Sequence, residues 1–225
     1  MKRKAKGLFI TGTGTDIGKT YVTGLIVKKL REAGLNCGYY KAAISGADSV
    51  GESDAGYVNR LADIGQTDDM LVPYLYKKAV SPHLASQIEG NPVEMAVVKK
   101  LFNKNAQQFD YLTMEGSGGI ICPIRYDEQQ KLFLEDIIKE LSLPSVIVAD
   151  AGLGTINAVV LTVEYMKSRS LPIKGIILND YTGGFMQDDN IKMIEAMTGI
   201  KIVALVKAGD IDIDIDSKEL AALYE

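Results

Sequence analysis

The stretch that decides the fold of this chain is GTGTDIGKT, which runs from Gly12 to Thr20. It follows a short apolar run and leads into a helical pattern over about residues 17–33. Glycines in a strand-to-helix turn let backbone N–H groups point at an anion, and the helix N-terminus adds partial positive charge. In loops that close with Gly-Lys-Thr, the lysine reaches the β- and γ-phosphates and the hydroxyl binds Mg²⁺. We therefore expect a nucleoside triphosphate here, in a loop one residue longer than the standard spacing.

Beyond this loop, short apolar segments alternate with helical patterns along most of the chain. We expect strands near residues 7–11, 36–41, 110–115, 145–150, 173–179 and 201–206. Helical patterns lie near residues 17–33, 52–64, 93–107, 133–141, 155–169, 185–198 and 216–224. Continuous apolar strands are typical of a parallel sheet covered by helices on both faces, and the alternation implies right-handed crossovers. The sequence thus predicts a single α/β domain over residues 1–225, doubly wound around a mostly parallel sheet.

Composition narrows the class of protein. Of the 225 residues, 47% are hydrophobic and 24% are charged, as in ordinary globular proteins. The net charge of −4 argues against a general nucleic-acid binder, which usually carries a basic surface. Residues 1–6 are basic, but only a short apolar run follows them. We expect neither a signal peptide nor a membrane span, and we expect a cytoplasmic location.

Three further features favour structural explanations. Cys37 and Cys122 lie in apolar segments, where buried free thiols are favoured, and the sequence leaves a disulfide open. His83 is the only histidine, so we expect a helix-start residue with a packing role rather than a metal ligand. The alternating segment 210–216 favours a solvated acidic loop over a short edge strand.

Polar residues at strand ends are the candidates for chemistry, because ligands of such folds bind beyond the carboxyl ends of the strands. Lys41 ends one strand and precedes a turn at Ser45; anion binding and a snorkelling surface lysine are equally open. Glu115 ends another strand before the glycine-rich stretch 116–119, and a Mg²⁺ ligand is favoured over a structural carboxylate. Asp54 opens a helix, either as an acid facing the helix dipole or as a second Mg²⁺ ligand.

Two more strand-end turns carry polar residues. The stretch from Gly152 to Asn157 offers a helix N-terminus to an anion such as a carboxylate, or is a plain turn with a helix cap. Asn179 and Asp180 end a further strand, where an amide can read a base edge or simply form a turn. These positions alone do not choose between the alternatives.

Taken in order, these segments resemble the dethiobiotin synthetase family, whose members use ATP in biotin synthesis. The matching segments cover almost the whole chain: Gly12–Thr20, Lys41 with Ser45-Gly46, Ser53-Asp54-Ala55, Ser81-Pro82-His83-Leu84, Glu115–Gly119, Leu153–Asn157 and Asn179-Asp180. The chain departs from the family pattern at Ala42, at Ala158 and in the segment from Val206 to Gly209, where an Ile-Pro pair is usual. The last departure leaves the preference for ATP over other nucleotides open.

The resemblance implies a reaction and its cofactor. A carbamate formed from CO₂ and 7,8-diaminopelargonic acid would attack ATP, and ring closure of the mixed carbamic–phosphoric anhydride would give dethiobiotin, ADP and phosphate. Lys41 and Lys19 are the implied catalytic residues. Mg²⁺ is the implied cofactor, held by Thr20, Asp54 and Glu115. The implied assembly is a homodimer.

The resemblance also implies the remaining site residues. The nucleotide-binding residues are Asp16, Ile17, Gly18, Lys19, Thr20, Tyr21, Asp54, Glu115, Gly116, Ser117, Gly118, Asn179 and Asp180. Substrate contacts are implied for Thr15, Ser45, Gly154 and Asn157, the last two from the other subunit.

Two other functions compete with this interpretation. Switch ATPases of the partition and nitrogenase-iron-protein type respond to a partner or to DNA, and usually carry a second lysine early in the loop. This chain has Thr13 and Gly14 there. An amidating relative acting on corrinoid carboxylates usually needs a glutaminase domain, for which 225 residues are too few. We therefore expect small-molecule partners, with neither nucleic acid nor membrane.

Overall fold

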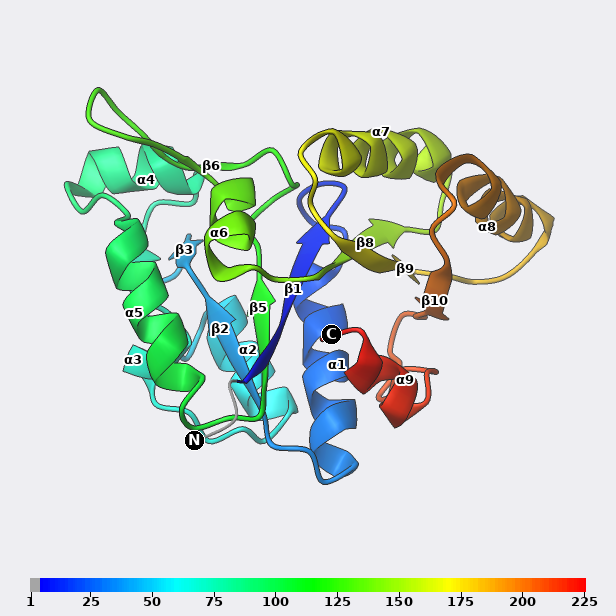
Figure 1. Cartoon of the computed structure of the whole chain (residues 1–225), viewed down its shortest axis with the longest axis horizontal. Helices are drawn as coiled ribbons and strands as arrows, with labels where there is room; N and C mark the ends of the chain where they lie inside the picture. Colours follow the sequence, from blue (N-terminus) through cyan, green and yellow to red (C-terminus); the bar gives the residue numbers. More distant parts are fainter. Residues whose placement is uncertain (1–4) are drawn as a thin grey trace.

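A six-stranded parallel sheet forms the centre of the computed structural model, which describes residues 5–225 (Figure 1). The strand order is β10-β9-β8-β1-β5-β2, and every neighbouring pair is parallel. The strands are β1 (Lys6–Gly12), β2 (Cys37–Lys41), β5 (Tyr111–Glu115), β8 (Ser145–Asp150), β9 (Ile173–Asn179) and β10 (Ile202–Leu205). Each expected strand forms within one residue of its expected ends. The predicted fold class is confirmed.

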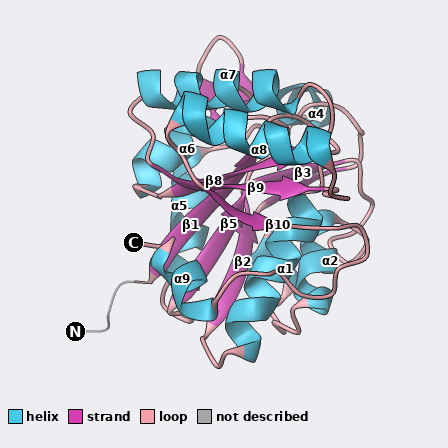
Figure 2. Cartoon of the chain, turned by 90° about the vertical axis from the view of Figure 1, so that its right-hand side faces the viewer, coloured by secondary structure: helices cyan, strands magenta, loops and turns pink. Residues whose placement is uncertain are grey.

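Helices cover both faces of this sheet, because successive side chains of each strand point to opposite sides. On one side, Leu8 and Ile10 of β1 pack with α1 (Lys19–Glu32), α2 (Asp54–Leu61) and α9 (Ser217–Ala222). On the other side, Phe9 belongs to a core with α5 (Met95–Asn105), α6 (Leu134–Leu141), α7 (Thr155–Ser168) and α8 (Phe185–Thr198). Figure 2 shows the strands between these two layers.

Several short helices and strands were not predicted from the sequence. They are β3 (Ala43–Ser45), α3 (Asp68–Leu71), β4 (Tyr74–Tyr76), α4 (Pro82–Glu89), β6 (Pro123–Tyr126) and β7 (Lys131–Phe133). The pairs β3–β4 and β6–β7 form two separate two-stranded sheets. Most of these elements have only three or four residues, which is too short for a periodic pattern to indicate them.

The acidic segment 210–216 forms a loop, as predicted, but it is not simply solvated. Ile213 and Ile215 are buried in the core beside α1, while Asp212, Asp214 and Asp216, which alternate with them, are exposed. Lys28 donates to the carbonyl of Ile211 at 2.6 Å, and Lys29 pairs with Asp212 at 2.6 Å. The long helix after the phosphate loop therefore holds the segment against the body of the protein.

The expectations for the cysteines and for a membrane span can be compared with residues 5–225. Cys37 and Cys122 are both free and buried there, as the free-thiol interpretation predicts. Across these residues, no helix combines the length and the apolar character needed to cross a bilayer.

Candidate active site

The loop between β1 and α1 forms one wall of a cavity at the carboxyl edge of the sheet. Gly18 has a φ of 82°, in the left-handed region that favours glycine. A side chain there would also collide with the amide of Asn179. Lys19 begins α1 and donates through Nζ to the carbonyl of Gly14 at 2.5 Å. The first N–H groups of α1 have no partner within a helix, so the loop presents donors and a lysine to one point.

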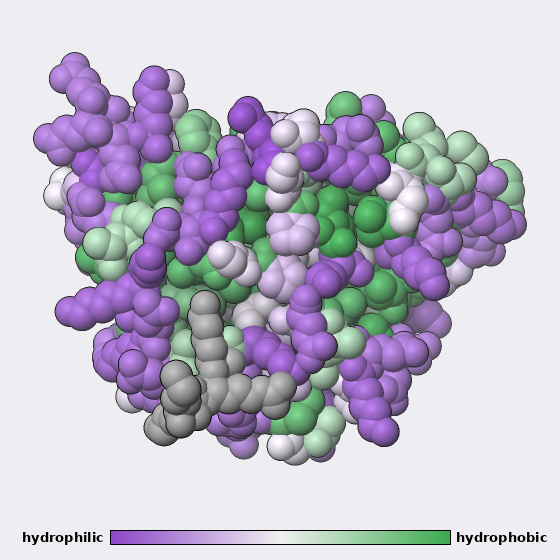
Figure 3. Space-filling view, viewed as in Figure 1, coloured by the Kyte–Doolittle hydropathy of each residue, from purple (hydrophilic) through white to green (hydrophobic). Residues whose placement is uncertain are grey.

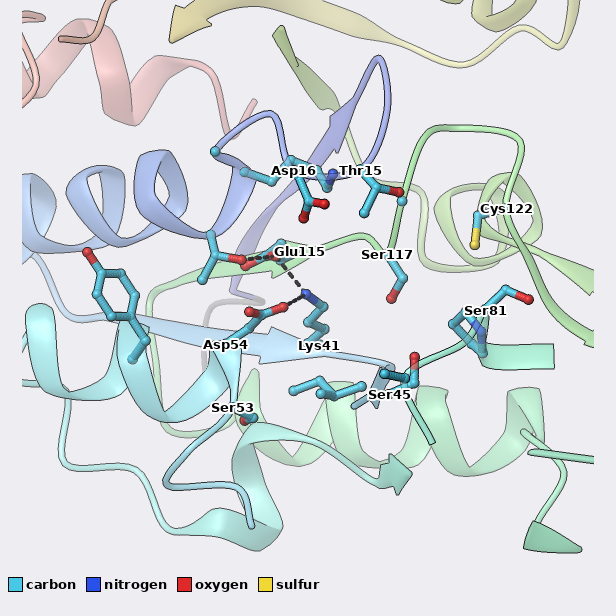
Figure 4. Close-up of a pocket in the computed structure, with 18 of the residues that line it drawn as sticks. Thr15, Asp16, Lys41, Ser45, Ser53, Asp54, Ser81, Glu115, Ser117 and Cys122 are labelled. Carbon is cyan, nitrogen blue, oxygen red and sulfur yellow. Dashed lines mark hydrogen bonds and ion pairs between the residues drawn. The ribbon is translucent and has the colours of Figure 1, made fainter. Parts of the chain in front are cut away.

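The cavity has a volume of about 1030 Å³ and combines parts of the chain that are far apart in sequence (Figure 4). Its walls come from the phosphate loop, the ends of β2 and β5, the start of α2 and the segment before α4. The structure brings together most of the expected site residues, since the cavity is lined by Thr15, Asp16, Gly18, Lys19, Thr20, Tyr21, Lys41, Ser45, Asp54, Glu115, Ser117 and Gly118.

At the centre of the cavity, Lys41 joins two carboxylates. Its Nζ donates to Oε1 of Glu115 at 2.7 Å and to Oδ2 of Asp54 at 2.5 Å, as Figure 4 shows. Lys41 and Glu115 are register partners on the adjacent strands β2 and β5, so the sheet itself places them side by side. Thr20 donates to the same Oε1 of Glu115 at 2.8 Å. Because Lys41 is only 4% exposed, it is not a snorkelling surface lysine.

The charges at this centre stabilise one another. Burial alone would lower the pKa of Lys41, but the neighbouring carboxylates of Glu115 and Asp54 outweigh burial and raise it. Burial likewise opposes ionisation of Asp54, but the ammonium of Lys41 outweighs burial and lowers the Asp54 pKa. Burial lowers the pKa of Lys19, and the attraction of Glu115 opposes this shift only in part. Lys41 is therefore a protonated lysine at neutral pH.

The oxygen atoms around Lys41 suit a magnesium ion. The hydroxyl of Thr20 and the carboxylates of Asp54 and Glu115 are hard oxygen donors, which Mg²⁺ prefers. Asp54 and Glu115 both pair with the ammonium of Lys41, and Thr20 bonds to Glu115, so the position already favours positive charge. In residues 5–225, no group of three acidic, histidine or cysteine side chains could hold a metal by itself. The donors therefore fit an ion that arrives with further oxygens from a nucleotide and water.

Some expected residues lie outside this cavity. Asn179 is buried behind the phosphate loop, where its Nδ2 lies 3.4 Å from the carbonyl of Ile17. Its Oδ1 is buried and has no hydrogen-bond partner among residues 5–225. Gly154 and Asn157 stand at the start of α7 and do not line the cavity of the described chain. Their roles in binding stay predictions.

Ile17, Gly116 and Asp180 complete the expected residues outside the cavity. Gly116 is buried, and a side chain there would press on Phe9 and Leu134. Asp180 is exposed, with a φ of 55° directly after β9. Their predicted roles in nucleotide binding also stay untested.

Among the residues near the site that the sequence analysis did not predict there are Cys122, Ser81 and Tyr39. Cys122 lines the cavity, and burial raises the pKa of its thiol to about 11, with Lys19 and Lys41 opposing the shift. Ser81 lines the cavity next to its neighbour His83, which lies on the second position of α4 with Nδ1 3.0 Å from the Ser81 hydroxyl. Tyr39 contacts Glu115 from below the cavity. Alternation along β2 places Tyr39 on the same face as Lys41, and this signal could have identified it.

Comparisons with known proteins agree on one family. The model of an AAA domain family matches residues 6–209. ATP-dependent dethiobiotin synthetase BioD of Brachyspira hyodysenteriae is 56% identical over 98% of this chain and all of that protein. The BioD protein of Clostridium botulinum Eklund 17B is 47% identical over 98% of this chain and 99% of that protein.

Solved structures share the fold at low identity. A ParA family ATPase from Chlorobium tepidum has a TM-score of 0.54 and 16% identity, over 92% of this chain and 85% of that chain. The MinD cell division protein of Aquifex aeolicus has a TM-score of 0.53 and 12% identity, over 98% of this chain and 86% of that chain. At these identities the likeness extends to the fold alone.

Proposed function

The chain belongs to the family of ATP-dependent dethiobiotin synthetases, and we propose that its reaction takes place between Lys41 and the phosphate loop. The reaction joins CO₂ to 7,8-diaminopelargonic acid and closes the ring to dethiobiotin, using ATP in biotin synthesis. The observation that carries the proposal is the buried Lys41, paired with two carboxylates, in one cavity with the loop that ends in Lys19 and Thr20. An anion that attacks a phosphate needs positive charge beside both groups, which Lys41 and Lys19 would supply.

Three bond changes make up the proposed reaction. One amine of the diamine adds to CO₂ and loses a proton, which gives a carbamate. A carbamate oxygen then attacks the γ-phosphorus of ATP, and ADP leaves with the electrons of the broken bond. The second amine attacks the carbonyl carbon of the resulting anhydride and loses a proton, and phosphate leaves with the electrons of the broken C–O bond as the cyclic urea forms.

The charged residues of the cavity fit these steps. Lys41 would steady the carbamate by exchanging part of its contact with Asp54 for the new anion. Lys19 would leave the carbonyl of Gly14 and bind the phosphate oxygens, together with the N–H groups of the loop. When bound, Mg²⁺ would neutralise charge on these oxygens, and Thr20, Asp54 and Glu115 are the residues that we expect to hold it. Fixing carbamate and phosphate in one place supplies much of the rate.

Binding of the diamine and the homodimer belong to the same proposal. Ser45 and Thr15 line the cavity and would orient the amines or the carbamate.

Large apolar side chains are exposed on and beside α7 and α8, among them Leu153 (92%), Leu161 (62%) and Phe185 (89%). Figure 3 shows apolar surface over this part of the molecule. Such patches are typical of protein interfaces, which supports pairing of two copies through this region.

Location and partners follow the same proposal. The net charge of −4 supports small-molecule partners over nucleic acid, and we expect the enzyme to act in the cytoplasm.

The test is formation of product from the purified protein. With 7,8-diaminopelargonic acid, bicarbonate and MgATP, we expect dethiobiotin, ADP and phosphate in equal amounts. ATP hydrolysis that proceeds without the diamine, and responds to a protein partner or DNA instead, would contradict the proposal and favour a switch ATPase.

A further inference from the structure

Tyr39 is a buried tyrosine whose hydroxyl reaches the carboxylate at the centre of the site. It lies on β2 two residues before Lys41, so both side chains face the α1 side of the sheet. Its hydroxyl donates a hydrogen bond of 2.9 Å to Oε2 of Glu115. The ring is fully buried, which means that this contact forms away from solvent.

The contact from Tyr39 completes the hydrogen bonding of Glu115. Oε1 of Glu115 accepts from Thr20 and Lys41 on the cavity side, and Oε2 accepts from Tyr39 on the core side. The last torsion of a glutamate is broad, so donors to one oxygen leave the plane of the carboxylate loosely defined. Donors on both oxygens fix the plane and keep Oε1 turned toward the cavity.

The backbone of Tyr39 is fixed as well. β2 is the last strand at one edge of the sheet, where a strand has backbone groups without a partner strand. The side chain of Gln66 takes the place of that strand, since Oε1 accepts from the Tyr39 N–H at 2.8 Å and Nε2 donates to the Tyr39 carbonyl at 3.0 Å. Gln66 is anchored in turn by a bond of 2.7 Å to Asn105. These hydrogen bonds hold the backbone of Tyr39 in place and thereby restrict the position of its hydroxyl.

The next residue offers a natural comparison. Tyr40 is also fully buried, but it points to the opposite face of the sheet, where its hydroxyl donates to the carbonyl of Val98 at 3.1 Å. Its ring packs edge-on against Phe102. The two tyrosines thus share a strand, burial and a satisfied hydroxyl. They differ in that only the Tyr39 hydroxyl, of the two, bonds to a group of the active site.

We propose that Tyr39 is a positioning residue that orients the Glu115 carboxylate and thereby sets the affinity of the site for Mg²⁺ with its nucleotide. The inference rests on the proposed function for the metal-binding role of Glu115. Groups that hydrogen-bond to a metal ligand commonly change metal affinity by about 10–100-fold when they are removed. Tyr39 stands in that relation to Glu115.

The test measures binding rather than turnover. The non-hydrolysable analogue AMP-PNP is titrated into the wild type, Tyr39→Phe and Tyr40→Phe by calorimetry, once with Mg²⁺ and once with EDTA. In Tyr39→Phe we expect affinity with Mg²⁺ to fall by about tenfold, and affinity in EDTA to stay within about twofold of the wild type. Tyr40→Phe should change neither affinity, because its hydroxyl lies on the other face of the sheet. Tyr39→Met, which also lacks the hydroxyl, replaces Tyr39→Phe if that variant is too unstable to titrate.

Two results would overturn the inference. An unchanged affinity with Mg²⁺ in Tyr39→Phe would show that the hydroxyl does not act through Glu115. An equal loss with Mg²⁺ and with EDTA would indicate general damage to the fold. The diamine is absent from these titrations, so a protein that binds MgAMP-PNP but makes no dethiobiotin contradicts the proposed function and not this inference.

Discussion

Two regions along the carboxyl edge of the sheet are built in different ways. The phosphate side consists of the loop before α1 with Lys41, Asp54 and Glu115. Lys41 and Glu115 are buried, and short hydrogen bonds join them to each other, to Thr20 and to Asp54. The base side, expected from the family resemblance, consists of Asn179, Asp180 and residues 206–209. Residues 207–209 are exposed, and Asn179 keeps a buried oxygen without a partner among residues 5–225.

Contacts on the base side are few and near the surface. The hydroxyl of Tyr21, in the first turn of α1, donates to the carbonyl of Asp210 at 2.5 Å. The Asp210 carboxylate accepts from the N–H of Lys207 at 2.8 Å and closes a tight turn. Hydrogen bonds within the protein thus hold the charged side chains of the phosphate side in place, whereas the residues expected to contact the base are held by few contacts. We therefore expect the reaction to depend strongly on the residues of the phosphate side and the enzyme to discriminate weakly between nucleotides.

The largest effect should come from the lysine of the phosphate side. Lys41→Ala removes the charge that steadies the carbamate, and we expect kcat to fall by about 10²–10³-fold, as for loss of one preorganised charge-stabilising group. Binding of ATP, measured by calorimetry, should survive because Lys19 and the loop remain. Thermal unfolding provides the control, since the variant leaves Glu115 buried without its partner. A normal kcat would remove Lys41 from the reaction.

The next effect concerns the metal. In Glu115→Gln one carboxylate ligand becomes a neutral amide, and we expect the Mg²⁺ concentration for half-maximal activity to rise by at least about tenfold at fixed ATP. Glu140→Gln is the matched control, because Glu140 pairs with Lys99 on the exposed surface. Identical magnesium curves for the wild type and Glu115→Gln would place the ion elsewhere.

For the base side, in contrast, we predict only a small effect of changing the nucleotide. Enzymes reject an analogue by factors of about 10⁴ only when buried hydrogen-bonding groups are left unpaired by it. Because residues 207–209 are exposed, we expect kcat/KM values for ATP and GTP to lie within about tenfold of each other. A strong preference for ATP would show that the base side is more ordered than the comparison implies.

The smallest effect that we expect is on the free energy of unfolding and its dependence on pH. The Asp54 pKa is lowered from 3.8 in the folded protein, so its contribution is complete above that value and is lost as the pH falls through the folded pKa. The side chain is 46% exposed, which limits the contribution to about 1 kcal/mol or less. Denaturant unfolding should show the wild type ahead of Asp54→Asn by this amount near neutral pH. The gap should close below pH 3.8; a gap of constant size would exclude this ionisation as its source.

The sequence predicts the sheet better than its surroundings. Several of the six strands of the sheet are continuous apolar runs, and such runs are easily recognised, whereas β3, β4, β6 and β7 have three or four residues each. Lys41 and Glu115 stood out because charged residues rarely end buried strands. Tyr39 did not, because a tyrosine in an apolar strand looks like any core residue until its hydroxyl partner is known.

A crystal structure with Mg²⁺ and AMP-PNP tests the central claim most directly. We expect the terminal phosphate between Lys19 and Thr20, with the Lys41 ammonium facing an open pocket beside it that can hold a carbamate. A Lys41 side chain turned away from the nucleotide, with the space between them filled by protein, would contradict the account.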